Sequence, residues 1–402
     1  MKPISKVVKI GEVCTISPPK GELKHTSLTQ DDFVSFLPME DLGISSKNIN
    51  PTKTKTLAEA SGSYTYFGEG DILLAKVTPC FENGKLGIAT GLTNKVGFGS
   101  SEFIVIRPDT TKVVPSYLYY RLLEPTFRAK GRSLMVGACG LKRLPKSYVS
   151  ESHLYLPSIS EQKRIVDILD AEFAKIDALK DNAEKNLQNA KDLFQAVLRK
   201  ELEPKEGWNT QTIGDICEVQ GGATPKRTER LFWENGTYPW FTVDDIREQG
   251  RIITDTKQKI TELAWNKSRV FPKNTVLLCC TASVGEYAIT TIPLTSNQQF
   301  NGLTIKKGVN IHPMFLFYYA STLKETLLKL SGKATIDFVS GAKVRAIKIS
   351  YPLSIDEQGD VISKLEYLEK MCFDLQKNYK RTIDLCSDLK QALLRKAFNG
   401  EL

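Results

Sequence analysis

Apolar side chains recur three and four positions apart along two stretches of this chain, residues 158–202 and 354–402. This spacing places them on one face of a helix, and it continues for roughly four to five heptads in each stretch. Neither stretch contains a proline that would interrupt a helix. We therefore predict two helices of about 40 residues, each ~60 Å long at ~1.5 Å per residue.

A helix of this length cannot bury its apolar face on a small domain, so we expect the two helices to pack against each other in antiparallel fashion. Lys180 and Gln376 occupy the same position in both apolar faces. Such a polar residue either fixes the register of the helices or marks a local solvated gap. The residues expected on the packing and partner-binding face are Val166, Leu169, Phe173, Ile176, Leu187 and Phe194, followed by Ile362, Leu365, Tyr379, Ile383 and Leu393.

The two helical stretches are copies of one another at an offset of 196 residues, as from Glu161 to Glu357. The segment 158–162 returns as 354–358, and 195–200 returns as 391–396. Both copies begin with the Ser-x-x-Glu spacing of a capping box, in which the serine and glutamate side chains satisfy free N–H groups reciprocally. The repeat predicts two similar halves related by a pseudo-two-fold axis.

The remaining residues form two globular modules that share a weaker repeat. Residues 70–74 and 274–278 each lead from a turn into a buried strand, and residues 115–120 and 313–318 each begin a helix with proline in its first turn. We predict an α+β protein in which two similar globular α/β domains are separated by two long antiparallel coiled-coil helices. The expected boundaries are 1–155 for the first domain, 156–202 for the first helix, 203–351 for the second domain and 352–402 for the second helix.

The positive charge of the chain is concentrated in the two modules. The chain of 402 residues has a net charge of +9. Residues 1–150 carry +7 and residues 203–350 carry +5, whereas 151–202 carry −2 and 351–402 carry −1. Basic modules joined by neutral or acidic helices are typical of proteins that bind a polyanion, although such an excess is also unremarkable for a domain of this size.

Composition argues against a metal site, a cofactor and a membrane. The eight cysteines form no C-x-x-C pair and the three histidines are far apart, so no zinc site is expected. We interpret the cysteines as small buried residues in a reducing compartment. No apolar run approaches ~20 residues, and the first six residues lack the apolar core of a signal peptide. We expect no membrane association and a cytoplasmic location.

No catalytic motif is complete. An amino-methyltransferase would need an Asn/Asp-Pro-Pro-aromatic clamp for a flipped base, and residues 17–20 lack both flanking residue types. Glu161 and Lys163 have part of the spacing of a nuclease metal cluster but no partner carboxylate. Residues 332–335 resemble a phosphate loop but lack a glycine five positions earlier. We therefore expect no catalytic residues, no metal and no cofactor.

Several segments together resemble one family over nearly the whole chain. The helix starts match at 157–162 and 353–358, and the helix ends match at 198–202 and 394–402. The second module matches at 221–225, 238–241 and 296–299, whereas the first departs at 17–21 and at 100–102. In these segments the chain resembles the specificity subunits of type I restriction–modification systems.

That resemblance implies a target-recognition domain in each module, each of which reads half of a split double-stranded DNA site. It also implies that the helices bind two methyltransferase subunits and space the two domains. Because the modules differ, we expect an asymmetric site with a non-specific gap of roughly one half to one turn of DNA. Whether restriction or translocase subunits join, or whether a partner chain carries nuclease activity, stays open. The competing hypothesis is a pseudo-dimeric scaffold that binds proteins and uses the helices as a rod.

Candidate DNA contacts are basic residues in the dissimilar parts of the modules, together with Thr224, which follows the glycine-rich turn. Arginine can bind the O6/N7 edge of guanine with two hydrogen bonds, whereas lysine mostly contacts phosphate. The alternative to base reading is that a candidate contacts phosphate or simply lies on the solvated surface. The candidates are Lys24, Lys47, Lys53, Lys55, Lys76, Lys85, Arg132 and Arg143 in the first module, and Thr224, Lys226, Arg227, Arg230, Arg247, Arg251, Lys257 and Lys259 in the second.

Overall fold

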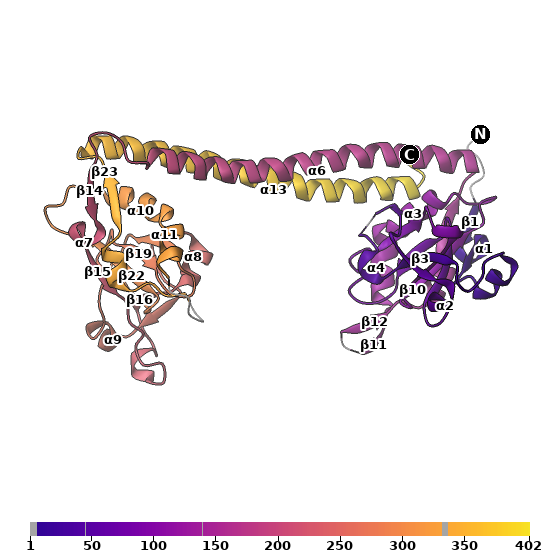
Figure 1. Ribbon diagram of the computed structural model, residues 1–402, viewed down its shortest axis with the longest axis horizontal. Helices are drawn as coiled ribbons and strands as arrows, with labels where there is room; N and C mark the ends of the chain where they lie inside the picture. The colour runs from indigo at the N-terminus through magenta and orange to yellow at the C-terminus, as the bar shows by residue number, and fades with distance from the viewer. Residues whose placement is uncertain (1–5, 45, 139, 332–336) are drawn as a thin grey trace. The chain divides into compact units, whose positions relative to one another are not determined.

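The computed structural model describes residues 6–44, 46–138, 140–331 and 337–402 (Figure 1). The chain divides into two compact units, of which the first comprises residues 1–184 and 380–402 and the second residues 185–379. The segment 332–335, considered above as a phosphate loop, lies outside the described residues, as do residues 1–5. The four domain boundaries expected from the sequence stay predictions.

The first module is built on two main sheets and two strand pairs. The first sheet has the order β2 (Cys14–Ile16), β10 (Phe103–Pro108), β7 (Ile72–Ala75), β8 (Leu86–Ala89) and β4 (Asn48–Ile49). The second has the order β5 (Lys53–Thr56), β3 (Phe33–Leu37), β9 (Val96–Gly99) and β6 (Thr65–Gly68). The pairs are β1 (Lys6–Lys9) with β13 (His153–Leu156), and β11 (Val136–Ala138) with β12 (Leu141–Arg143).

Short helices connect and cover these strands. They are α1 (Ile10–Val13), α2 (Leu57–Ala60), α3 (Pro115–Leu123), α4 (Pro125–Ser133) and α5 (Lys146–Glu151), with the 3-10 turns η1 (Lys20–His25), η2 (Met39–Asp41) and η3 (Thr93–Lys95). Helix α3 begins at Pro115, as predicted, because proline has no N–H to lose in the first turn of a helix.

Strand β7 lies at the centre of the first module and is buried on both faces. Ile72 and Leu74 join the apolar cluster that contains Tyr117 of α3. Leu73, which points to the other face, joins the cluster that contains Phe67 of β6. The alternation follows from the two-residue period of a strand. It places α3 on one face of the five-stranded sheet and the four-stranded sheet on the other.

The second module repeats the five-stranded sheet of the first module and the strand pair at its ends. Its five-stranded sheet has the order β15 (Cys217–Gly221), β22 (Phe300–Ile305), β19 (Val276–Cys279), β20 (Tyr287–Thr290) and β17 (Ile252–Ile253). A three-stranded sheet has the order β18 (Gln258–Ile260), β16 (Tyr238–Phe241) and β21 (Thr295–Ser296), and β14 (Asn209–Thr212) pairs with β23 (Lys348–Tyr351). The other elements are α7 (Ile213–Ile216), η4 (Arg230–Phe232), α8 (Val243–Gln249), α9 (Glu262–Asn266), α10 (Pro313–Thr322), α11 (Lys324–Leu330) and α12 (Gly341–Arg345).

Matching strands also pair in the same direction in both modules. β3 with β9 and β4 with β8 are parallel in the first, and β16 with β21 and β17 with β20 are parallel in the second. The prediction of two similar α/β modules within an α+β chain is therefore confirmed.

The two long helices are α6 (Ile159–Glu201) and α13 (Ile355–Phe398), as the apolar spacing predicts. In the first unit Lys390 of α13 forms an ion pair with Asp177 of α6, and Arg164 donates to the carbonyl oxygen of Leu402 at 2.8 Å. In the second unit Lys364 pairs with Glu201. In each unit the two helices are therefore antiparallel.

The side chains predicted to lie on the packing face are shielded from solvent. Among the eleven named residues, five are buried and six are half-buried, and none is exposed. Leu375 and Leu389, which lie one position to the side, are exposed. The polar position Lys180 pairs with Glu184 of its own helix at 3.7 Å, which does not distinguish a register device from a solvated gap.

The capping boxes form only in part. Ser158 Oγ accepts from the N–H of Glu161 at 3.3 Å, and Ser354 Oγ accepts from that of Glu357 at 3.4 Å. The glutamates bind elsewhere, since Glu161 pairs with Arg164 and Glu357 accepts from the indole N–H of Trp208 at 3.0 Å. The prediction of a reciprocal glutamate contact is therefore wrong at both helices.

Candidate nucleic-acid interface

Three loops of the second module meet beside strands β15, β16 and β21. The N–H of Ala223 donates to the carbonyl oxygen of Ser296 at 2.8 Å, and that of Asn297 donates to Phe241 at 3.2 Å. Gly222 permits this approach, because a Cβ there would lie 2.2 Å from Ser296 Oγ and 2.3 Å from the carbonyl oxygen of Asn297. The glycine-rich turn and the Ser-Asn-Gln-Gln turn thus form one surface.

Polar side chains project from this surface. Thr224 Oγ1 donates to the side-chain oxygen of Gln298. Asn297 Nδ2 donates to Gln299 Oε1 at 2.8 Å, and Asn297 Oδ1 accepts from the N–H of Gln299 at 3.0 Å. Amide side chains offer both donors and acceptors, which is the chemistry that reads base edges in DNA.

Arg227 stacks against two tryptophans next to this surface. Its guanidinium carbon lies 3.9 Å from the ring centroid of Trp233 and 4.5 Å from that of Trp240. The Trp240 indole N–H donates to Ala223 at 3.2 Å, which ties the aromatic pair to the glycine-rich turn. Desolvation beside the rings lowers the pKa of the Arg227 guanidinium from its usual value. Stacking occupies the face of the guanidinium and leaves its N–H edges available.

The candidate arginines and lysines of the second module other than Arg227 and Lys226 all have acidic partners. Arg230 pairs with Glu234 at 3.5 Å, Arg247 with Asp244 at 2.9 Å and Arg251 with Glu286 at 2.9 Å; Lys257 pairs with Glu248, and Lys259 pairs with Asp255 at 3.0 Å. Arg247 and Arg251 line one depression of about 650 Å³ together with Lys324. Across the described parts of the chain, Arg227 and Lys226 have no carboxylate partner.

In the first module the candidates are dispersed. Lys24 is exposed on η1, Lys53 pairs with Asp41 at 2.7 Å, Lys55 lies over Phe36 at 4.8 Å, and Arg132 pairs with Glu82 at 3.4 Å. Lys47 pairs with Asp170 of α6, and Lys85 donates to the carbonyl oxygen of Met39 at 2.7 Å. These last two contacts hold the module together.

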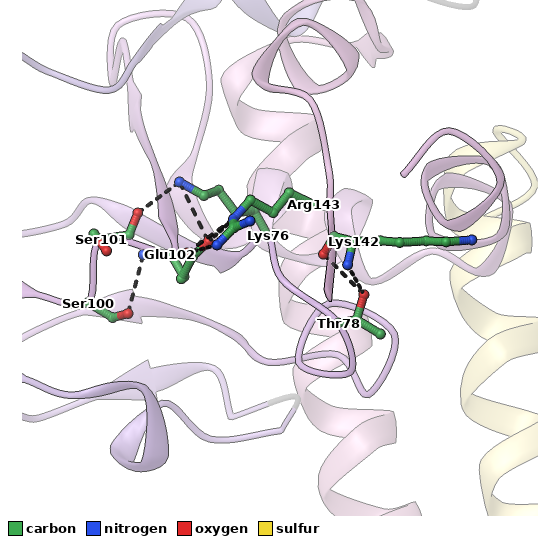
Figure 2. A network of polar contacts seen from close by, with 7 residues as sticks. All are labelled: Lys76, Thr78, Ser100, Ser101, Glu102, Lys142 and Arg143. Atoms are coloured by element: carbon green, nitrogen blue, oxygen red, sulfur yellow. Dashed lines mark hydrogen bonds and ion pairs between the residues drawn. The ribbon is translucent and has the colours of Figure 1, made fainter. Parts of the chain in front are cut away.

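Lys76 and Arg143 come together around Glu102 (Figure 2). Arg143 Nη2 lies 2.7 Å from Glu102 Oε1, and Lys76 Nζ lies 3.8 Å from Glu102 Oε2. The hydrogen bonds from Arg143 lower the pKa of the Glu102 carboxyl group, whereas desolvation lowers the pKa of Lys76. Glu102 was not among the candidates drawn from the sequence, and neither were Trp233, Trp240 and Gln298. A search for basic residues cannot find them.

The part of the chain that the structure describes contains no group of three His, Cys, Asp or Glu residues placed to hold a metal ion. Within the same described ranges, none of the helices combines the length and the apolar character needed to cross a membrane.

Comparison with known proteins identifies the class of the chain. The family described as type I restriction modification DNA specificity domain matches residues 5–189 and again residues 205–385. The chain belongs to this family.

Individual proteins similar to this chain are specificity subunits of type I restriction enzymes. The chain is 32% identical over 191 residues to the EcoEI specificity subunit of Escherichia coli, a match that covers 48% of this chain and 31% of that protein. It is 32% identical over 217 residues to the MjaIX specificity subunit of Methanocaldococcus jannaschii, covering 51% and 49%. The chain therefore spans about a third to a half of the length of these relatives.

Two solved structures share the fold. The HsdS subunit from Thermoanaerobacter tengcongensis superimposes with a TM-score of 0.66 at 18% identity over 99% of this chain and 97% of that one. A chain from a study of complex assembly and conformational transition in the type I R-M system gives a TM-score of 0.83 at 18% identity, with both chains covered completely.

Proposed function

We propose that this chain is the sequence-specific DNA-binding subunit of a type I restriction–modification complex. In this role it recognises a bipartite, asymmetric duplex site and directs methyltransferase subunits to it in the cytoplasm. The chain supplies recognition, and its partners supply the chemistry. Membership of the specificity-domain family and the basic charge of both modules favour this role over a scaffold that binds only proteins.

The observation that carries the proposal is the surface around Arg227. An arginine that is stacked on two tryptophans is already ordered, so its N–H edges can bind a base or a phosphate without a large loss of entropy. The side-chain amides of Asn297 and Gln298 lie on the adjoining turn. This combination of cation, amides and aromatic rings suits a DNA surface.

A binding selection with a pool of random duplexes tests the proposal. The full chain together with its methyltransferase subunits should select two different half-sites separated by a fixed non-specific gap. Its affinity should fall steeply with salt, because phosphate binding releases counterions. A single continuous palindrome, or binding without any sequence preference, would refute the proposal.

Arg227 and Arg230 form a matched pair for this experiment. Arg227→Ala should weaken binding to the selected site by about 5- to 140-fold, since a well-placed arginine contact contributes ~1–3 kcal/mol. Arg230→Ala removes the same charge from the same loop, but Arg230 is paired with Glu234 and its side chain is 86% exposed. Its loss should leave sequence preference unchanged. Equal effects of the two variants would argue that only total charge matters.

We propose further that exposed apolar residues of α13 bind the methyltransferase subunits. Tyr367, Met371 and Leu375 lie four residues apart and share one helix face in the second unit, and Leu385 and Leu389 do so in the first. Apolar side chains gathered on a helix in this way mark a protein-binding surface. Met371→Asp should reduce recovery of the methyltransferase with the tagged chain, whereas Lys370→Asp on a neighbouring face should not.

A further inference from the structure

The turn at Ser100–Glu102 takes the place of the Ser-Asn-Gln-Gln turn of the second module. The carbonyl oxygen of Glu102 accepts from the N–H of Lys76 at 2.9 Å, just as that of Gln299 accepts from the N–H of Cys280 at 2.7 Å. The N–H of Glu102 donates to Ser100 Oγ at 3.2 Å, matching the bond from Gln299 to Asn297. Glu102 is therefore the counterpart of Gln299, and a carboxylate replaces an amide.

The backbone on either side of Arg143 is fixed. The N–H of Lys142 donates to Thr78 Oγ1 at 3.0 Å, and the N–H of Thr78 donates to the carbonyl oxygen of Lys142 at 3.0 Å. On the other side, the N–H of Leu144 donates to the carbonyl oxygen of Lys76 at 2.7 Å. Figure 2 shows the side chain of Lys142 extending away from Glu102 while that of Arg143 turns toward it.

The guanidinium of Arg143 meets Glu102 through one of its two hydrogen-bonding edges. Nε donates to both carboxylate oxygens at 3.1 and 3.0 Å, and Nη2 donates to Oε1 at 2.7 Å. This is the Nε/Nη2 edge. The opposite edge, formed by Nη1 and the second Nη2 proton, has no partner among the described residues, and 45% of the Arg143 side chain is exposed. That free edge can bind the O6 and N7 atoms of guanine together.

Lys76 contacts the turn that carries Glu102 and lies near the Glu102 carboxylate. Its Nζ donates to the carbonyl oxygen of Ser101 at 2.8 Å, and its side chain is only 20% exposed. Lys76 is therefore committed to the turn and is poorly placed to contact DNA. After the hydrogen bonds from Arg143, the charge of Lys76 also lowers the pKa of the Glu102 carboxyl group.

Arg251 and Arg247 of the second module lack this arrangement. Arg251 uses Nη1 for the carbonyl oxygen of Tyr287 at 2.9 Å and Nη2 for Glu286 at 2.9 Å, so both ends of its outer edge are engaged. Arg247 uses Nη1 for Asp244, three residues earlier in its own helix. A guanidinium that is held through both Nε and Nη2, as in Arg143, keeps its outer edge free.

We infer that Arg143 reads a guanine in the half-site of the first module and that Glu102 is the positioning residue that aims it. This inference rests on the proposed function. A guanidinium fixed in advance by a carboxylate loses little freedom when it meets the base, and the fixed plane of its free edge sets which base pair is read.

Binding selection with the full chain and its methyltransferase subunits tests the inference position by position. Arg143→Lys keeps the charge but removes the planar pair of N–H donors that Glu102 holds in place and that matches the O6 and N7 atoms of guanine. One base pair in one half-site should lose its guanine preference by about 5- to 140-fold, which is ~1–3 kcal/mol at ~1.4 kcal/mol per tenfold. All other positions should stay as in the wild type. Glu102→Gln should weaken the preference at that same position, because the amide accepts only through one oxygen.

Arg164→Lys in α6 is the matched control and should change no position, because Arg164 also binds a carboxylate, that of Glu161, through Nε and Nη2 but lies outside both modules. If Arg143→Lys retains every preference of the wild type, Arg143 does not read a base and the inference fails while the proposed function stands. If Glu102→Gln leaves the guanine preference intact while Arg143→Lys removes it, Glu102 is not a positioning residue. If the wild type selects no sequence, the proposed function fails and the inference fails with it. Thermal unfolding of each variant shows whether its fold is retained.

Discussion

Gln162 Oε1 accepts a hydrogen bond of 2.8 Å from the backbone N–H of Val114, and the glutamine side chain is completely buried. Its Nε2 donates to the carbonyl oxygens of Lys112 and Pro157, both at 2.9 Å. One side chain therefore ties the first turn of α6 to the loop that precedes α3 in the same unit. All three partners are backbone groups, so the contact does not depend on which side chains surround it.

Gln358 does the same in the second unit. Its Oε1 accepts from the N–H of His312 at 2.7 Å, and its Nε2 donates to Asn310 at 2.9 Å and Pro352 at 2.8 Å. The residue is also completely buried. The repeated glutamine is thus the joint between each long helix and its module.

Gln162→Ala should lower the free energy of unfolding by about 3 kcal/mol or more. The change leaves one backbone N–H and two carbonyl groups without partners, and each buried unpaired group costs ~1–3 kcal/mol. Urea unfolding followed by circular dichroism measures the loss. Gln195→Ala is the control, since Gln195 is exposed on the same helix, and it should stay within ~0.5 kcal/mol of the wild type. A similarly small effect of Gln162→Ala would contradict the proposed joint.

The long helices could be predicted from the sequence because their pattern is local. Spacing of three and four residues and the absence of proline place α6 and α13 within a few residues of their observed bounds. The structural role of Gln162 at the start of α6 could not be predicted, for a related reason. Ser-x-x-Glu is a local pattern and suggested Glu161, whereas the partners of Gln162 lie up to 50 residues away in sequence. The sequence offers one indication of this role. The glutamine is the same in both copies of the repeat, as Gln162 and Gln358, whereas a nearby position differs, with Ser160 in one copy and Asp356 in the other.

The candidate interface could be predicted only in outline. The sequence shows where arginines and lysines are, but whether each is free depends on carboxylates placed by the fold. Arg143 and Glu102 are 41 residues apart. The stacking of Arg227 likewise depends on Trp240, which β16 brings beside the glycine-rich turn. Pairing over such separations is a property of the tertiary structure, so residue type alone could not separate Arg227 from Arg230.

Gly222→Ala should disrupt the surface of the second module, whereas Gly221→Ala should not. A Cβ at position 222 would lie within 2.5 Å of backbone oxygens in the facing turn, so the two turns must separate. We expect a loss of ~1–3 kcal/mol in stability and a loss of sequence preference in one half-site only. At position 221 the nearest atom to a new Cβ is 3.6 Å away, an ordinary contact. Binding selection and urea unfolding of the two variants compare them directly.

Gly359→Ala should stabilise the second unit by up to ~1 kcal/mol. Gly359 lies in the second turn of α13, where alanine has the higher helix propensity, and a Cβ there meets no atom within 4 Å. The midpoint of urea unfolding should rise with little change in its slope. A fall in stability would show that the first turns of α13 are more tightly enclosed than the described contacts indicate.

The ion pair between Glu201 and Lys364 should make the stability of the second unit depend on pH. The hydrogen bond from Lys364 lowers the pKa of the Glu201 carboxyl group below its usual value of 4.5. A carboxyl group whose pKa is lowered by folding stabilises the folded state above its unfolded pKa, and this contribution is lost as the pH falls through the folded value. Glu201→Gln should therefore be less stable than the wild type at about pH 7, and the difference should shrink below about pH 4.5.

Urea unfolding of the wild type and Glu201→Gln at about pH 7 and about pH 3.5 measures this change. Glu203→Gln is the matched control, because Glu203 is exposed and has no ion-pair partner among the described residues. Its difference from the wild type should be small at both pH values. If the difference between Glu201→Gln and the wild type stays constant with pH, the loss in that variant comes from packing and not from the charge that joins the end of α6 to α13.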